Sequence, residues 1–307
     1  MTLSRLTTAL LAAATVASLA ACSDDADGAS ADPAAPKTRT VEHVRGTTEV
    51  PAEPERVVVL DTGELDSAVA LGVTPVGAVR APVDSGLLSY LEPQLDDVEL
   101  VGEIGEPDLE KIAALEPDLI LGSELRVADF YDELSEIAPT VFTETVGVAW
   151  KENLELHARA LGREDEAERL LQSYTERAAA LGEQVDDGTT VSVVRFVPGE
   201  IRLYAKENFL GTVLADAGIA RPAPQDVEEF SVNVSREQVD KAAGDVVLVG
   251  TYGDPAETDG PAVLGGPLWA RATSGSEVVE VDDDVFFLGI GIGAAERVLD
   301  ELEQILG

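Results

Sequence analysis

The sequence is poor in the side chains on which metal centres, disulfides and hydrolytic sites depend. Its 307 residues include one cysteine, Cys22, and two histidines, His43 and His157, which lie far apart in the chain. A single cysteine excludes a disulfide within the chain. Zinc or manganese sites usually combine several histidines and carboxylates, so we expect no direct binding of a bare metal and no cofactor. The sequence has neither a Walker lysine motif nor a G-x-S-x-G elbow, and no catalytic constellation is recognisable.

Positive charge is also scarce. The chain has 21 basic and 59 acidic residues, a net charge of −38. Nucleic-acid binding needs clustered lysine and arginine, so this balance argues against such a partner. The acidity is typical of a surface that keeps a protein dispersed in water, and attraction of a cationic ligand is the weaker alternative.

The N-terminal residues 1–21 have the pattern of an export signal. Arg5 precedes a mainly apolar run that is too short and too rich in alanine to predict a membrane-spanning helix. The run ends in L-A-A-C, which resembles a bacterial lipobox, in which cleavage exposes the cysteine and its thiol receives a lipid. A chance cysteine after an ordinary signal peptide is the alternative. For residues 22–40 we expect lipidated Cys22 and a disordered tether rich in Ala, Asp and Pro, holding the protein at the outer face of a membrane.

The rest of the chain contains an internal repeat on either side of a predicted long helix. Residues 107–122 and 234–249 each start as a short acidic helix, pass through a Pro-Asp or Gly-Asp turn, and continue as an apolar strand. The repeat places Glu110 opposite Glu237 and Asp118 opposite Asp245. A second pair of segments, residues 70–75 and 216–222, also agrees. Two copies predict two related α/β lobes rather than a many-copy solenoid.

Residues 163–181 have apolar positions at helical spacing and are expected to form the connecting rod, with Gly162 and Gly182 breaking the helix at its ends. We therefore predict an α/β protein with two Rossmann-like lobes joined by a single long helix, and a ligand cleft between the lobes. The expected boundaries are 41–149 for the N-terminal lobe, 150–185 for the helical connection and 186–307 for the C-terminal lobe.

Continuous apolar runs such as residues 57–60 and 191–194 are typical of strands buried on both faces of a parallel sheet. Ligands of such sheets bind beyond the carboxyl ends of the strands, which makes Arg80 a candidate ligand contact; an ordinary surface ion pair is the alternative. Trp150 can equally stack on a ligand or seal a core. The G-I-G-I-G run at residues 289–293 has the wrong spacing for a dinucleotide site, and we expect a flexible entrance to a terminal helix.

Several of these stretches together resemble a known family. The segments R-V-V-V-L-D-T-G-E-L-D-S-A-V-A-L-G-V-T-P-V-G, G-E-P-D-L-E-K-I-A-A-L-E-P-D-L-I-L-G and V-S-R-E-Q-V-D-K-A-A-G-D-V-V-L-V are similar to solute-binding lipoproteins of ABC importers for iron–siderophores, haem and vitamin B12. The likeness extends from about Arg56 to the C-terminus. It implies two lobes with a rigid connecting helix. It also implies that Glu110 and Glu237, the pair singled out by the repeat, dock into arginine pockets of a permease, although both glutamates also suit helix N-termini.

The resemblance further implies a cleft lined by arginines and aromatic side chains. The candidates in this sequence are Arg80, Arg126, Trp150, Arg195, Tyr204 and Tyr252. The expected function is non-catalytic: a monomer captures a ferric siderophore, whose iron stays in its chelator, and presents it to a permease driven by an ATPase. Haem or cobalamin binding is the alternative within the same class. A secreted enzyme or a surface adhesin on the same fold are alternatives of other classes.

Overall fold

A computed structural model of the chain describes residues 37–82 and 86–307. The predicted signal segment, Cys22 and most of the predicted tether lie outside these residues. The described chain begins with an antiparallel hairpin, β1 (Thr38–His43) and β2 (Gly46–Pro51). Strand β1 thus takes up the last three residues of the segment expected to be a tether. No helix in the two described ranges combines the length and the apolar character that crossing a membrane requires.

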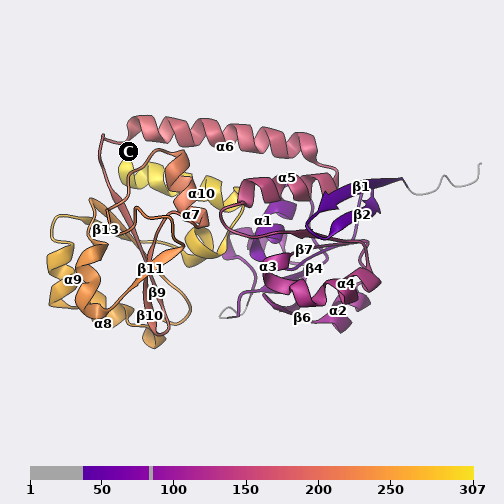
Figure 1. The fold of residues 1–307 in the computed structure, drawn as a ribbon, viewed down its shortest axis with the longest axis horizontal. Coiled ribbons are helices and arrows are strands. Elements are labelled where there is room, and N and C mark those ends of the chain that lie inside the picture. Colours follow the sequence, from indigo (N-terminus) through magenta and orange to yellow (C-terminus); the bar gives the residue numbers. More distant parts are fainter. Residues whose placement is uncertain (1–36, 83–85) are drawn as a thin grey trace, which may run out of the picture. The chain divides into compact units, whose positions relative to one another are not determined.

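The N-terminal lobe lies on the right in Figure 1. It is built on a six-stranded sheet with strand order β6-β5-β4-β3-β7-β8. Its strands are parallel except for β6, which pairs antiparallel with β5. The strands are β3 (Val57–Val59), β4 (Gly77–Arg80), β5 (Glu99–Glu103), β6 (Glu106–Pro107), β7 (Leu119–Ser123) and β8 (Thr140–Thr143). The helices are α1 (Thr62–Ala70), η1 (Ser89–Gln94), α2 (Leu109–Ala114), α3 (Glu124–Val127), η2 (Ala128–Phe130) and α4 (Tyr131–Ile137).

The C-terminal lobe has a five-stranded sheet of order β11-β10-β9-β12-β13. Strands β9, β12 and β13 are parallel, whereas β10 and β11 run antiparallel to their neighbours. The strands are β9 (Val191–Val197), β10 (Glu200–Tyr204), β11 (Ser231–Val234), β12 (Val246–Thr251) and β13 (Glu277–Glu280). The helices are α7 (Phe209–Asp216), η3 (Arg236–Ala242), η4 (Pro255–Glu257), α8 (Gly260–Leu264), α9 (Pro267–Ala272), η5 (Asp284–Leu288) and α10 (Ile292–Leu306).

In both copies of the internal repeat, an aspartate just before a central strand makes equivalent hydrogen bonds. The Asp118 carboxylate, just before β7, accepts hydrogen bonds from the backbone N of Glu55 and Arg56 at 2.8 and 2.9 Å. The Asp245 carboxylate, just before β12, accepts bonds from the backbone N and hydroxyl of Thr190 at 2.8 and 2.7 Å. In both lobes the aspartate therefore fixes the start of one parallel strand against its neighbour.

The second half of the repeat is a shared helix ending. Gly72 follows α1 with φ of +78°, and Gly218 follows α7 with φ of +66°. Glycine adopts this left-handed conformation without the steric penalty that other residues have. One difference separates the copies of the repeat: residues 109–114 form an α-helix, whereas the equivalent η3 is a 3₁₀ helix that starts with a capping box of Ser235 and Gln238.

Helices α5 (Trp150–Leu161) and α6 (Glu164–Gln184) connect the lobes, and α6 packs against α5 and α10 (Figure 1). Gly162 ends α5 in the left-handed conformation, as expected. The prediction that Gly182 breaks the rod is wrong, because α6 continues through it to Gln184. A Cβ at Gly182 would collide with the carbonyl oxygen of Ala217, so this glycine lets α6 lie close to the end of α7.

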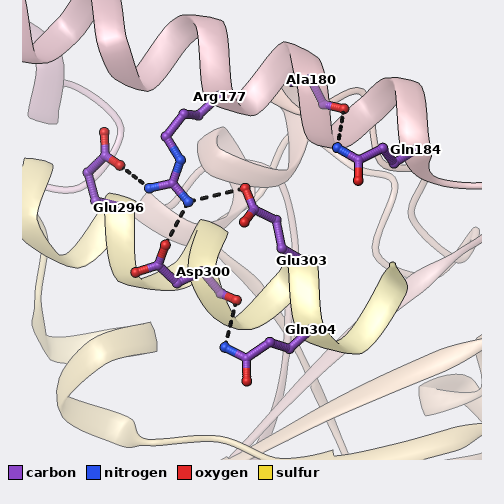
Figure 2. Close-up of polar contacts among 7 residues, drawn as sticks. All are labelled: Arg177, Ala180, Gln184, Glu296, Asp300, Glu303 and Gln304. Carbon is purple, nitrogen blue, oxygen red and sulfur yellow. Dashed lines mark hydrogen bonds and ion pairs between the residues drawn. The ribbon is translucent and has the colours of Figure 1, made fainter.

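Arg177 fastens α6 to the terminal helix. Figure 2 shows its guanidinium between three acidic side chains of α10, with Nη2 2.6 Å from Asp300 and 3.1 Å from Glu303 and Nη1 bonded to Glu296. Beneath this contact a single hydrophobic cluster takes in side chains from both sheets and from helices α1, α5, α6, α7 and α10. The lobes thus share this core, and each lobe has a second hydrophobic cluster of its own on the other face of its sheet.

The glycine run at residues 289–293 forms a closely packed joint rather than the loose helix entrance we expected. Asp66 of α1 reaches this run, and its carboxylate accepts hydrogen bonds from the backbone N of Gly293 and Ala294 at 2.8 and 2.9 Å. A Cβ at Gly291 would collide with that carboxylate. The N-terminus of α10, an electrostatically favourable place for an anion, is therefore occupied by a side chain from the other lobe.

Candidate functional site

A cavity of about 720 Å³ lies at the carboxyl ends of strands from both sheets. Its N-terminal wall includes Ala81 after β4, Arg126 of α3 and residues 145–148 after β8. The C-terminal wall includes Arg195, Tyr204 and Tyr252. This volume and this mixture of apolar and few polar groups are typical of small-molecule sites.

Arg126 is the cation of the N-terminal wall. Its Nε lies 2.8 Å from Oδ2 of Asp61, whose side chain is fully buried at the start of α1. The Arg126 side chain is 36% exposed, and its two terminal nitrogens have no hydrogen-bond partner among the described residues. Asp61 therefore orients the guanidinium while leaving its outer edge able to donate to a ligand.

Arg195 holds the aromatic wall of the other lobe together. Its guanidinium bonds both carboxyl oxygens of Asp283, with Nε 2.7 Å from Oδ1, and Nη1 donates to the Tyr204 hydroxyl at 3.0 Å. The same group lies 4.7 Å from the ring centre of Tyr252 and 4.8 Å from that of Phe287. With its side chain only 8% exposed, Arg195 positions the rings more than it offers free donors.

Arg202 also lines the cavity, although it was not among the residues predicted from the sequence. Its Nε lies 2.6 Å from Glu200, its side chain is 29% exposed, and its terminal nitrogens bond no group in the described part of the chain. In the β9–β10 hairpin Arg202 pairs directly with Arg195. Since paired residues point to the same face of a sheet, that register was the signal that could have identified it.

Four phenylalanines that line the cavity were also missed, among them Phe230 and Phe287. Tyr204 packs between Phe230 and Phe287, with ring centres 5.1 and 4.9 Å away. Phe230 is half exposed. No motif marks either phenylalanine, and only the fold brings them to the cavity.

Two of the six predicted ligand contacts do not line this cavity. Arg80 forms an ion pair with Glu103 of the neighbouring strand, although Ala81 and Pro82 beside it do line the cavity. Trp150 is 1% exposed, and its indole NH donates to the Thr212 hydroxyl at 2.9 Å. For Trp150 the structure thus shows the core role. For Arg126, Arg195, Tyr204 and Tyr252, contact with a ligand stays a prediction.

The two predicted docking glutamates are both at the surface. Glu110 lies in the first turn of α2 and Glu237 in the first turn of η3, one on each lobe. A hydrogen bond from the Ser235 hydroxyl lowers the pKa of Glu237, which favours its charged form. Surface exposure alone does not show docking, so the docking role of both glutamates stays a prediction.

The described residues contain no group of three or more His, Cys, Asp or Glu side chains that could hold a metal ion. A ligand of the cavity would meet guanidinium donors and aromatic faces instead. Such a lining suits an organic anion rather than a bare ion.

A model of the family described as "Periplasmic binding protein" matches residues 57–282. The chain belongs to this family. Its members are substrate-binding proteins, which confirms the resemblance drawn from the repeat segments.

Individual relatives support the same assignment. The chain is 36% identical over 302 residues to the "Probable siderophore-binding lipoprotein YfiY" of Bacillus subtilis, covering 93% of each protein. It is 29% identical to the "Fe(3+) dicitrate-binding periplasmic protein FecB" of Escherichia coli, covering 87% of this chain and 89% of FecB. The crystal structure of Staphylococcus aureus SirA complexed with staphyloferrin B matches with a TM-score of 0.77 and 32% identity, over 87% of this chain and 98% of SirA. The two-lobed α/β fold is thereby confirmed.

Proposed function

We propose that the protein is the extracytoplasmic solute-binding component of an ABC importer and captures a ferric siderophore in the cavity between its lobes. One observation supports this most strongly. In a chain of net charge −38, the cavity concentrates Arg126 from one lobe and Arg202 from the other, each with unbonded terminal nitrogens among the described residues. Guanidinium groups bind carboxylate and similar oxygens through paired, charge-assisted hydrogen bonds.

The cargo fits the rest of the cavity as well. The aromatic wall of Tyr204, Phe230 and Phe287 offers apolar faces to the organic arms of a chelate. Iron would enter inside its chelator, since the lining supplies donors to the chelator and not ligands to the metal. The dicitrate and siderophore named for the relatives are cargo of this kind.

Delivery would use the outer surface of both lobes. We propose that Glu110 and Glu237 dock into arginine pockets of a permease whose ATPase drives transport, and that a lipid on Cys22 keeps the monomer near the membrane. The shared core and the Arg177 contacts between α6 and α10 would allow only modest movement of the lobes. Glu110→Arg with Glu237→Arg should abolish cellular uptake and leave ligand affinity unchanged; normal uptake by this double variant would contradict the docking role.

Binding is tested by titrating the protein with ferric dicitrate, ferric staphyloferrin B, haem and cobalamin, each iron chelate being compared with its iron-free form. Tryptophan fluorescence is a suitable readout, because the ring centre of Trp150 lies 5.8 Å from that of Phe209, which lines the cavity. We expect saturable quenching by a ferric chelate and none by its iron-free form. Binding of haem or cobalamin alone would move the assignment to those ligands, and no binding in fluorescence or calorimetry would contradict it.

A further inference from the structure

A second, much smaller cavity adjoins the ligand cavity, and the two share Val146 and Ile290 in their walls. Its other lining residues come from α1 and α5: Gly63, Glu64, Ser67, Asn153 and His157. The space of about 10 Å³ is about that of one water molecule. The cavity thus lies where the first helix of the N-terminal lobe, the helical connection and the segment before α10 meet.

Two polar side chains of this small cavity are buried and have no hydrogen-bond partner among the described residues. Both carboxyl oxygens of Glu64 and both ring nitrogens of His157 are fully covered, and none makes a hydrogen bond within residues 37–82 and 86–307. Glu64 is 1% exposed and His157 is 2% exposed. Buried polar groups are nearly always hydrogen-bonded, so a water molecule between the two is the partner that the lining suits.

Burial also decides which form of each group the site favours. Burial and the nearby Asp61 carboxylate raise the pKa of Glu64 to about 8. Burial, together with the positive charge of Arg159, lowers the pKa of His157 to about 3. At neutral pH the uncharged form of both groups therefore predominates. Each group then has one hydrogen to donate and at least one lone pair to accept, so one water molecule can bond to both.

Glu64 is electrostatically connected to the ligand cavity. The charges that act on it are Asp61, which begins the same helix, and Arg126, whose positive charge lowers the pKa of Glu64. His157 faces it from α5, and Asp66, farther along α1, is bonded to the start of α10. Among the residues that the structure describes, Arg126 is the charge that favours ionised Glu64, and an anionic ligand at Arg126 would offset it.

We propose that Glu64 and His157 form a buried protonation site, bridged by one water molecule, that takes up a proton when an anionic ligand binds at Arg126. The proposal rests on the proposed function for the ligand and adds its linkage to protons. Ligand binding and proton binding at Glu64 should strengthen each other. Because the ligand-bound protein holds the proton more tightly, ligand affinity falls as pH rises through the pKa of Glu64.

The test is calorimetry of ferric dicitrate binding near pH 8, the pKa of Glu64, in two buffers of different ionisation enthalpy. The dependence of the observed enthalpy on the buffer gives the number of protons taken up. We expect the wild type to take up more protons than Glu64→Gln, with both proteins binding the chelate. Proton exchange by the chelate itself is common to both and cancels in the comparison.

Glu301→Gln is the matched control, because burial raises the pKa of this half-buried glutamate on α10 as well, but it does not line either cavity. It should take up as many protons as the wild type. Equal uptake by the wild type and Glu64→Gln would overturn the proposal. A crystal structure at neutral pH should show a water molecule bonded to Glu64 and His157. Absence of this water molecule would contradict the proposed water bridge.

Failure to bind ferric dicitrate would count against the proposed cargo only. The protonation site can still be tested without a ligand, by measuring thermal unfolding as a function of pH. As pH rises from 4.5, the ordinary pKa of a glutamate, to about 8, the pKa of Glu64 in the folded chain, the thermal midpoint of the wild type should fall relative to that of Glu64→Gln and then level off. Parallel curves for the two proteins would contradict the site irrespective of any ligand.

Discussion

Asp66 and Glu64 lie two residues apart on α1, and both are fully buried, yet their surroundings are opposite. Asp66 accepts hydrogen bonds from the Tyr90 hydroxyl at 2.6 Å and from two backbone NH groups of α10, which oppose the rise in its pKa caused by burial. Glu64 has no donor within the described ranges. Burial thus produces a structural joint at Asp66, where donors are fixed, and the proposed proton site at Glu64, where they are not.

Removing the Asp66 carboxylate should have the largest effect. Asp66→Ala leaves the first NH groups of α10 and the Tyr90 hydroxyl without their acceptor, and it breaks the joint between the lobes. We expect the free energy of unfolding to fall by about 3–5 kcal/mol, measured by urea denaturation. Asp66→Asn keeps part of the geometry and should lose less; a loss below about 1 kcal/mol for Asp66→Ala would show that the joint is not structural.

His157, which like Glu64 is buried without a hydrogen-bond partner among the described residues, should make the folded protein less stable in acid. Its pKa is about 3 in the folded chain, against 6.5 when exposed, so its contribution to stability is present above pH 6.5 and is lost as pH falls towards 3. Two pH units below 6.5 this loss amounts to about 3 kcal/mol. His157→Gln cannot titrate, so its free energy of unfolding should change less with pH over that window; equal slopes would contradict the account.

Crowding the joint should have an intermediate effect. A Cβ in Gly291→Ala would displace the Asp66 carboxylate, and we expect destabilisation by about 1–3 kcal/mol. Gly275→Ala is the control, because a Cβ there meets no atom within 4 Å. Thermal unfolding of both variants measures the difference, and equal midpoints would mean that the joint tolerates the added methyl group.

The surface link in Figure 2 should matter least. Arg177→Gln removes contacts to Glu296, Asp300 and Glu303, which are partly solvated, so the cost should be about 1 kcal/mol or less. Added salt should reduce the difference between this variant and the wild type. A cost as large as that of Asp66→Ala would place the main connection between the lobes at α6 rather than at the α1–α10 joint.

What could be predicted from the sequence was the part encoded by local pattern and repetition. Asp118 and Asp245 have equivalent roles, because each accepts hydrogen bonds from residues of its own lobe. Gly72 and Gly218 are equivalent as well, since each ends a helix in the left-handed conformation. Contacts that involve elements outside the repeat left no such pattern. Gly182 is a glycine because Ala217 passes close to it, and nothing near it in the chain shows that.

The residues of the candidate site also divide into those that local sequence pattern could indicate and those that only the tertiary fold brings together. Arg126 and Tyr252, which the resemblance suggested, follow strands β7 and β12 and line the cavity, as the rule that ligands bind beyond strand ends would expect. The same rule selected Arg80, which does not line it. Arg202 required the register of a hairpin, and Phe230 and Phe287 required the tertiary fold. Trp150 could not be assigned from sequence, because an aromatic side chain at a lobe edge packs equally well on a ligand or in a core.

The central claim, that the cavity binds an anionic chelate through arginines of both lobes, is tested most directly by the affinity of Arg202→Gln. This variant removes one exposed guanidinium without leaving a buried carboxylate unpaired, and Arg169→Gln on α6 is a control of equal charge change. In calorimetric titration with the ferric chelate that binds the wild type, we predict that Arg202→Gln weakens binding about tenfold or more and that the control does not. Equal affinity for all three proteins would contradict the account.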